Sequence, residues 1–326
     1  MAVMLDSLPV LILNPHSRCN CRCAMCDIWK TTKTREISVE DLKRQLKSIQ
    51  RLQVQWVVFS GGEALMHSDL WGLIDVLRER QIRITLLSSG LLLGRHAASL
   101  VKSVDDVIVS LDGPPQVHNS IRGVPGAFEI TAAGIASILE RDPNFRISAR
   151  CTVQRSNFRH LRDTVDAARG LSLNSMSFLA ADVDSTAFAR PDGWPMEKKA
   201  AVRLDSAEIA VLESEIEALI SRGECGRFVC ESPAKLRRIA RHFRVVLNEM
   251  PPIAPACNAP WNSAVVEADG TVRPCFFQPP IGHLNTGKPL YQILNGPEAV
   301  AFRDSLDVAT NPICQKCVCS LNWRLQ

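Results

Sequence analysis

Apolar runs of strand length alternate with amphipathic segments through the first half of the chain. The strand-like runs are Pro9–Leu13, Val54–Ser60, Ile82–Ser88, Val107–Leu111, Ile147–Val153 and Ser175–Leu179. The helical segments run from Ser38 to about Ile49 and over Asp69–Arg80, Leu92–Val101, Phe128–Arg141 and Phe158–Ala168. Ser38 and Asp41 resemble a capping box at the first of these. Alternating strands and helices predict a parallel sheet with right-handed crossovers, so we expect an α/β fold, a partial (β/α)6 TIM-type barrel.

The alternation of strand-like and helical segments ends after the sixth strand-like run, Ser175–Leu179. Residues 1–183 are expected to form the barrel core, 184–250 a loop and helical linker, and 251–326 a small C-terminal domain. Within the linker, helices are predicted from about Asp205 to Arg222 and from Ser232 to about Asn248, where Ser232 is a good N-cap.

Composition narrows the class of protein. The 326 residues are 46% hydrophobic, enough for one large core and a smaller appendage. The net charge of +4 is spread along the chain, so no nucleic-acid partner is expected. No apolar run has the length of a membrane span and no signal peptide is recognisable, which favours a cytoplasmic protein without membrane contact.

Twelve cysteines carry most of the candidate chemistry. In a large chain without a secretion signal, clustered cysteines favour reduced, metal-binding thiols over disulfides. Cys19, Cys23 and Cys26 follow the first strand directly and can hold three corners of an iron–sulfur cubane. A zinc knot with His16 as fourth ligand is the alternative. Cys21 lies inside this triplet and is not expected to be a ligand.

This triplet resembles that of the radical S-adenosylmethionine (SAM) superfamily. The resemblance implies a [4Fe–4S] cluster whose fourth iron binds SAM through its amino and carboxylate groups. An electron from the cluster, supplied by a flavodoxin- or ferredoxin-type donor, then cleaves the sulfonium bond and yields a 5′-deoxyadenosyl radical that abstracts hydrogen from a substrate. The protein would supply cluster ligation, orientation and protection from side reactions.

Motifs at the ends of later strands extend the resemblance. Gly61, Gly62 and Glu63 match the family's Gly-Gly-Glu motif, which receives the methionyl amino group, although a simple turn would also suit these residues. Ser110 and Asp112 match its Ser-x-Asp-Gly segment, which implies cosubstrate contact by the serine and places Asp112 near the substrate or ribose. His118 and Arg122 are expected to order the loop that follows.

Two further strand-end positions leave alternatives open. Ser88-Ser89-Gly90 stands where relatives usually carry Thr-Asn-Gly, which leaves the role of Ser89 undefined. Arg150 matches a basic residue that pairs with the cosubstrate carboxylate in relatives, in a charge-assisted contact. A solvated salt bridge is an equal alternative for this arginine.

A second cysteine set lies near the C-terminus. Cys257, Cys275, Cys314 and Cys317 resemble the ligands of the auxiliary domains called SPASM and, in the shorter form, Twitch, and the cysteine count favours the short form with one extra [4Fe–4S] cluster. Cys319 could replace one ligand, and a zinc ribbon is the alternative site. Asp269 and Gly270 predict a hairpin turn that presents Cys275.

These features predict a radical SAM enzyme of oxidoreductase type acting on a small molecule, which it oxidises or rearranges in a biosynthetic pathway. Because only eighteen residues precede Cys19, no leader-binding domain is expected there. A maturase that modifies a ribosomal peptide or protein is the alternative enzyme. A non-catalytic iron–sulfur electron carrier or a zinc-binding module is the alternative of another class. No catalytic residue beyond the cofactor ligands is predicted.

Overall fold

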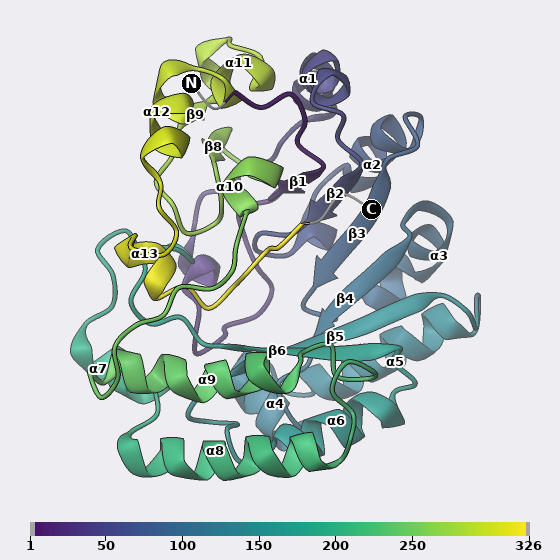
Figure 1. Ribbon diagram of the computed structural model, residues 1–326. Helices are drawn as coiled ribbons and strands as arrows, with labels where there is room; N and C mark the ends of the chain where they lie inside the picture. Colours follow the sequence, from purple (N-terminus) through teal and green to yellow (C-terminus); the bar gives the residue numbers. More distant parts are fainter. Residues whose placement is uncertain (1–3, 324–326) are drawn as a thin grey trace.

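One nine-stranded sheet forms the centre of the molecule in the computed structural model, which describes residues 4–323 (Figure 1). Its order is β6-β5-β4-β3-β2-β1-β7-β8-β9. The first six strands run parallel in sequence order, as expected of a partial βα barrel. They are β1 (Val10–Leu13), β2 (Trp56–Phe59), β3 (Arg83–Ser88), β4 (Asp106–Ser110), β5 (Arg146–Val153) and β6 (Ser175–Ala180). This confirms the predicted α/β class.

The strands alternate between a fully buried face and a half-buried face. In β5, Ile147, Ala149, Cys151 and Val153 are buried, while Arg150 on the opposite face is half-buried. Because side chains alternate along a strand, the buried set packs under the outer helices and the other set lines the inside of the barrel.

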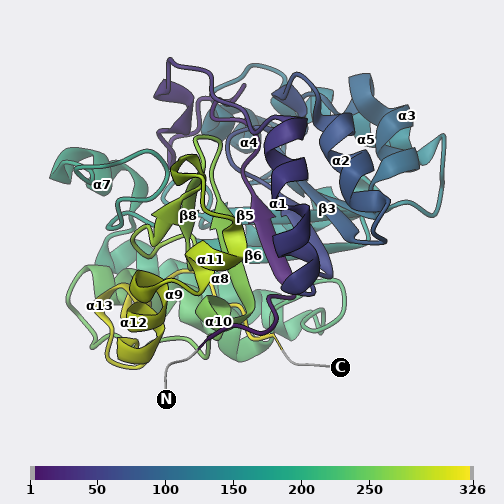
Figure 2. The same cartoon turned by 90° about the horizontal axis from the view of Figure 1, so that it is seen from above.

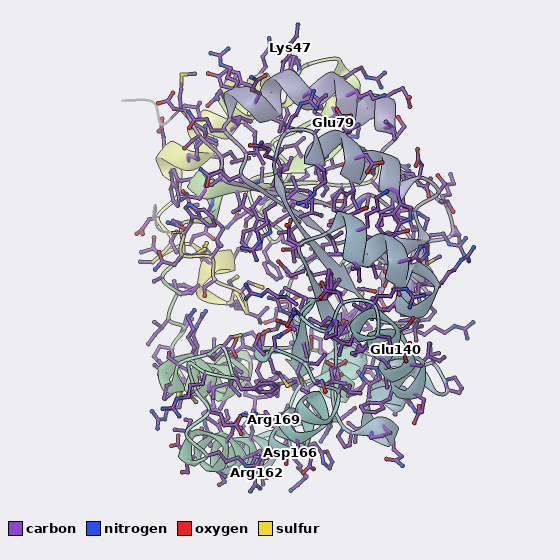
Figure 3. The ribbon with its side chains drawn as sticks, turned by 90° about the vertical axis from the view of Figure 1, so that its right-hand side faces the viewer. Lys47, Glu79, Glu140, Arg162, Asp166 and Arg169 are labelled. Carbon is purple, nitrogen blue, oxygen red and sulfur yellow. The ribbon has the colours of Figure 1, made fainter. Side chains whose placement is uncertain are left out.

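Helices cover the outer face of the barrel, as Figure 2 shows for those that follow β1, β2 and β3. The covering helices are α1 (Val39–Arg51), α2 (Leu70–Arg78), α3 (Leu93–Ser103), α5 (Ala127–Leu139) and α6 (Leu161–Gly170). The predicted capping box is present: Asp41 N–H donates to Ser38 Oγ, and Ser38 N–H donates to Asp41. Figure 3 shows the outward-facing charges on these helices, including Lys47 on α1 and Asp166 on α6. The amphipathic pattern therefore buries the side facing the sheet.

The α6 helix begins three residues later than predicted. Asn157 holds the preceding residues in turns, since its Oδ1 accepts from Gln154 N–H and its amide donates to the carbonyls of Asp112 and Thr152. Helix α6 is paired with α8 (Ser206–Ser221) through ion pairs such as Arg162–Glu215. Helix α9 (Pro233–Val246) packs between α8 and β6, and both long helices match their predicted positions (Figure 1).

Within residues 4–250, two α-helices were not predicted as such. Helix α4 (Pro115–Arg122) occupies the expected loop after β4, and α7 (Met196–Val202) lies in the expected linker. The signals for α4 were local: proline at its first position and Gly123 in the left-handed conformation at its end. Short 3-10 turns η1 (Ile28–Lys30) and η2 (Ala64–Met66) follow the first two strands.

The C-terminal region continues the barrel sheet. Strand β7 (Ser263–Val266) pairs parallel with β1, and β8 (Thr271–Arg273) and β9 (Gly282–His283) extend the sheet antiparallel. The predicted turn is present, with Gly270 at φ +92°. The remaining elements are α10 (Ala259–Asn262), η3 (Leu284–Thr286), α11 (Leu290–Leu294), α12 (Pro297–Ser305) and α13 (Pro312–Gln315). None of the helices in the described part of the chain is both long and apolar enough to span a bilayer.

Candidate functional site

The cysteine triplet lies on the loop between β1 and η1, at the carboxyl end of the barrel. Cys19, Cys23 and Cys26 are close enough for each thiol to influence the ionisation of the others. Cys21 is buried between them and hydrogen-bonds to both Cys19 and Cys23. The hydrogen bond from Cys21 lowers the pKa of Cys23 to about 7 against the effect of burial, and Arg122 lowers it too. Burial raises the pKa of Cys26 to about 12.

The Gly-Gly-Glu motif supports one side of this loop. Glu63 N–H donates to the Arg18 carbonyl at 2.9 Å. A β-carbon on Gly62 would stand 2.1 Å from that same oxygen, closer than any real contact, so only glycine permits the approach. Gly61 has φ +101° and lies against Asn14. Gly62 and Glu63 therefore do more than form a turn, because they contact the backbone of Arg18, the residue before Cys19.

The Glu63 side chain joins the ends of β2 and β3. Its carboxylate is fully buried and accepts hydrogen bonds from Ser89 N–H at 2.7 Å, Leu65 N–H at 3.1 Å and the Ser88 hydroxyl. Burial raises the pKa of Glu63, although the bonds from Ser89 oppose that shift. The Ser89 hydroxyl donates to Asn20 Oδ1 at 2.9 Å, so the serine at the variant position reaches the cysteine loop.

The C-terminal end of α4 supports the other side of the cysteine loop. Arg22 N–H donates to the Arg122 carbonyl at 2.8 Å and Ala24 N–H donates to the Ile121 carbonyl at 3.1 Å. A β-carbon on Gly123 would stand 2.8 Å from the Arg22 carbonyl oxygen. Arg122 was expected only to order the loop that follows, but the segment Ile121–Gly123 holds the cysteine loop in place.

A buried charge network continues from α4 to a cysteine ligand. Arg122 Nη2 lies 2.6 Å from the Asp112 carboxylate, and Arg122 Nη1 donates to Cys23 Sγ at 3.6 Å. Asp112 Oδ1 also accepts from Thr152 N–H, and Asp112 N–H donates to His118. Burial, with the Arg122 charge, lowers the pKa of His118 to about 3, so the imidazole is a neutral acceptor. This placement favours a role for Asp112 in holding Arg122 over direct contact with the ribose.

Ser110 and Arg150 face the inside of the barrel from neighbouring strands. They are register partners of β4 and β5, and Arg150 Nε donates to Ser177 Oγ on β6 at 3.3 Å. Glu231, which accepts from Phe178 N–H, lies near Arg150. Burial raises the pKa of Glu231, and the Arg150 charge acts against that shift. Arg150 is thus half-buried, with a serine hydroxyl and a carboxylate nearby.

The structure brings the C-terminal cysteines together. Cys275 follows β8 and interacts with Cys314 on α13 and with Cys257, while Cys317 interacts with Cys275 and Cys257. Gln278 Nε2 lies 3.4 Å from Cys314 Sγ, and Arg238 on α9 donates to the Cys317 carbonyl at 2.7 Å. Cys319 is near Cys257, and also near Arg150 and Asp182 of the barrel.

The donor sets suit cubane clusters. Within residues 4–323, no three His, Cys, Asp or Glu side chains are arranged around a single ion. A cubane requires no such arrangement, because each thiolate binds a different iron. Three thiols at the barrel loop and four in the C-terminal region supply soft ligands of the kind that such clusters bind.

A segment predicted mainly as linker connects the two cysteine sites. We call Asp182–Lys199 the bridging segment. Phe188 accepts a hydrogen bond from Asp27 N–H, next to Cys26, and its ring lies 4.9 Å from that of Phe276, next to Cys275. Arg190 is fully buried, ion-pairs with Asp182 and lies 4.3 Å from the Trp194 ring centroid. No local pattern predicts these contacts, because they join distant parts of the chain.

Comparison with known proteins agrees with this geometry. The radical SAM superfamily model matches residues 13–168, and the iron–sulfur cluster-binding SPASM model matches residues 257–318. The chain thus carries a radical SAM domain followed by a C-terminal SPASM domain. These domains imply [4Fe–4S] clusters and SAM as cofactors, and both cysteine sets fit cluster binding.

Two curated relatives match about half and about four fifths of this chain, respectively. Fe-coproporphyrin III synthase of Methanosarcina barkeri is 30% identical over 162 residues, 48% of this chain and 40% of the relative. The subtilosin biosynthesis protein AlbA of Bacillus subtilis is 23% identical over 274 residues, 80% of this chain and 53% of the relative. This chain thus spans about half the length of such relatives or less.

Solved structures show the same fold over nearly the whole chain. SuiB of Streptococcus suis bound to SAM superposes with a TM-score of 0.68 at 14% identity, covering 98% of this chain and 74% of SuiB. The enzyme anSMEcpe, with bound SAM and a peptide, gives 0.66 at 18% identity, covering 94% of this chain and 85% of that one. At such identities the likeness concerns the fold alone.

Proposed function

We propose that this protein reductively cleaves SAM and uses the resulting 5′-deoxyadenosyl radical to abstract hydrogen from a substrate. The observation that carries the proposal is the cysteine loop, whose backbone is fixed from one side by Gly61–Glu63 and from the other by Ile121–Gly123. When bound, a reduced [4Fe–4S] cluster supplies the electron for this cleavage. The chain's own contribution is to hold the three thiols in a fixed arrangement.

The proposed roles follow the positions of the side chains. Cys19, Cys23 and Cys26 would hold the first cluster, and Cys257, Cys275, Cys314 and Cys317 the second. SAM would bind at the loop edge formed by Gly61, Gly62 and Glu63, with Ser110 and Arg150 on the barrel's inner face. Arg150 suits an anionic group because it is half-buried and faces inward, where a charge-assisted hydrogen bond is stronger than in water.

The substrate we propose is a small molecule that is oxidised or rearranged. An auxiliary cluster in the 251–326 region would accept the electron of an oxidation, and a flavodoxin- or ferredoxin-type protein in the cytoplasm would reduce the first cluster. A ribosomal-peptide maturase is the second candidate. It is supported by the AlbA match, which extends over 80% of this chain rather than the barrel alone.

The test is anaerobic reconstitution with iron and sulfide, followed by reduction in the presence of SAM. We expect about eight irons per chain, four for each cubane, and release of 5′-deoxyadenosine. The Cys26→Ala variant should form no 5′-deoxyadenosine. The control is Cys225→Ala, which replaces a cysteine outside both sets and should form 5′-deoxyadenosine normally. Reconstituted protein that forms none would overturn the proposal. Deuterated candidate substrates would then identify the abstracted position, since deuterium would appear in 5′-deoxyadenosine.

A further inference from the structure

Within the described residues, the hydrogen bond from Arg122 to Cys23 has no counterpart at Cys19 or Cys26, although the Arg190 charge also acts on Cys26. Cys19 Sγ contacts Asn20 and Cys26 Sγ accepts from Ile28 N–H, whereas Cys23 Sγ meets a guanidinium. Arg122 is 7% exposed and Asp112 is fully buried, so this charge pair lies in a low-dielectric interior beside one ligand.

The guanidinium is held in one orientation. Asp112 binds it from one side at 2.6 Å, and Asp112 is itself fixed by Thr152 N–H at 2.9 Å and by its own bond to His118. The Arg122 backbone carbonyl accepts from Arg22 N–H, so the same residue supports the loop and contacts a ligand on it. Such contacts around a ligand commonly orient it and set the properties of the metal centre.

We propose that Arg122 is a positioning residue that raises the reduction potential of the cluster at Cys19, Cys23 and Cys26, and that Asp112 sets how much of its charge the cluster experiences. This inference rests on the proposed function only in placing a cluster at these cysteines. A hydrogen bond to a ligand sulfur and a nearby positive charge both stabilise the reduced cluster, which carries one more negative charge. Asp112 partly offsets that charge.

Substitutions of Arg122 and of Asp112 are therefore expected to shift the reduction potential of the first cluster in opposite directions. Arg122→Gln removes the positive charge and leaves Asp112 unpaired, so the potential should become more negative. Asp112→Asn retains the guanidinium and removes the offsetting charge, so the potential should become more positive. Asparagine can still accept the Thr152 hydrogen bond at Oδ1. Loosening of the loop would not produce opposite signs, because both substitutions would disturb the same support.

The experiment is a potentiometric titration of the reconstituted full-length protein, followed by electron paramagnetic resonance. Added SAM marks the signal of the first cluster, and the auxiliary cluster is an internal reference that should not shift. Arg22→Gln is the matched control. Arg22 directly precedes Cys23 and carries the same charge, but its side chain is exposed to solvent, which screens that charge. The cluster potential of this variant should stay near the wild-type value. Arg122→Lys keeps the charge and should fall between Arg122→Gln and wild type.

Three results would overturn the inference. They are equal potentials in Arg122→Gln and wild type, shifts of the same sign in Arg122→Gln and Asp112→Asn, or loss of the first cluster's iron from both Arg122→Gln and Arg122→Lys. The last result would mean that Arg122 only supports the loop. Failure of the proposed function is a separate result, because it would appear as wild-type protein that holds the cluster but forms no 5′-deoxyadenosine.

Discussion

Trp194 donates its indole N–H to the Asp27 carboxylate at 2.7 Å and thereby attaches the bridging segment to the residue after Cys26. Lys198 and Lys30 contact the same carboxylate, which is 9% exposed. At the far side of the segment, Asp184 pairs with Lys316, next to Cys317. The bridging segment thus contacts residues beside both cysteine sets.

Removing the indole donor should weaken this attachment. Trp194→Phe leaves the buried Asp27 with one donor fewer, and we expect the free energy of unfolding to fall by about 1–3 kcal/mol. Trp71→Phe on the outer helix α2 is the control, with a smaller expected loss. Denaturant unfolding of both variants measures the difference. Equal losses would show that the hydrogen bond adds nothing beyond ring packing.

Gly62 offers a steric test of the cysteine loop. Gly62→Ala places a methyl group against the Arg18 carbonyl and should cost about 1–3 kcal/mol, with loss of iron from the first cluster. Gly170→Ala is the matched change, because no atom lies within 4 Å of its β-carbon position, and it should stay within about 0.5 kcal/mol of wild type. Iron analysis and unfolding curves report both effects. Full iron retention in Gly62→Ala would contradict the steric account.

The C-terminal ligand set can be resolved by counting iron. Alanine at Cys257, Cys275, Cys314 or Cys317 should remove about four irons per chain or replace them by a damaged cluster. Cys319→Ala should retain all of them, because the other four thiols suffice for one cubane even though Cys319 lies near Cys257 and Cys317. Cys151→Ala, in the core of β5, is the control. If Cys319→Ala loses iron and one of the four does not, Cys319 is a ligand in its place.

His242 on α9 predicts a loss of stability in acid. Burial lowers its pKa to about 4, from about 6.5 in an unfolded chain. Between these values the unfolded chain binds the proton more readily, so the stability contributed by neutral His242 is present above pH 6.5 and is lost as pH falls toward 4.

Between pH 7.5 and 5.5, wild type should therefore lose about 1 kcal/mol more unfolding free energy than His242→Gln. His160→Gln is the control, because that imidazole is 38% exposed. Urea unfolding at the two pH values gives the comparison. The same pH dependence in wild type and His242→Gln would exclude the histidine as its cause.

The sequence predicted the features that depend on local pattern. The period-two alternation of Ile147–Val153 marks a strand with one buried face, and the Ser38–Asp41 capping box forms between residues three apart. The cysteine spacing and Gly61–Glu63 indicated the site because both are contiguous. The same local reasoning could have predicted helix α4, because Pro115 stands at its first position and Gly123 at its C-terminal end.

The contacts that were missed join residues far apart in the chain. Arg122 lies 99 residues from Cys23, and Trp194 lies 167 residues from Asp27. Which strand end faces which helix end depends on how the strands of the partial barrel are arranged in space, and no local periodicity encodes it. Asp112 was predicted to face the substrate or ribose, and only the fold showed that its carboxylate pairs with Arg122.

The parallel pairing of β7 with β1 has a consequence for how the chain avoids self-association. Strand β1 is apolar throughout, and without β7 its backbone donors and acceptors would form an open sheet edge. Open apolar edges recruit strands from other molecules and lead to aggregation. The SPASM region therefore covers this edge of the barrel sheet, and a barrel expressed without β7 should aggregate more readily than the whole chain.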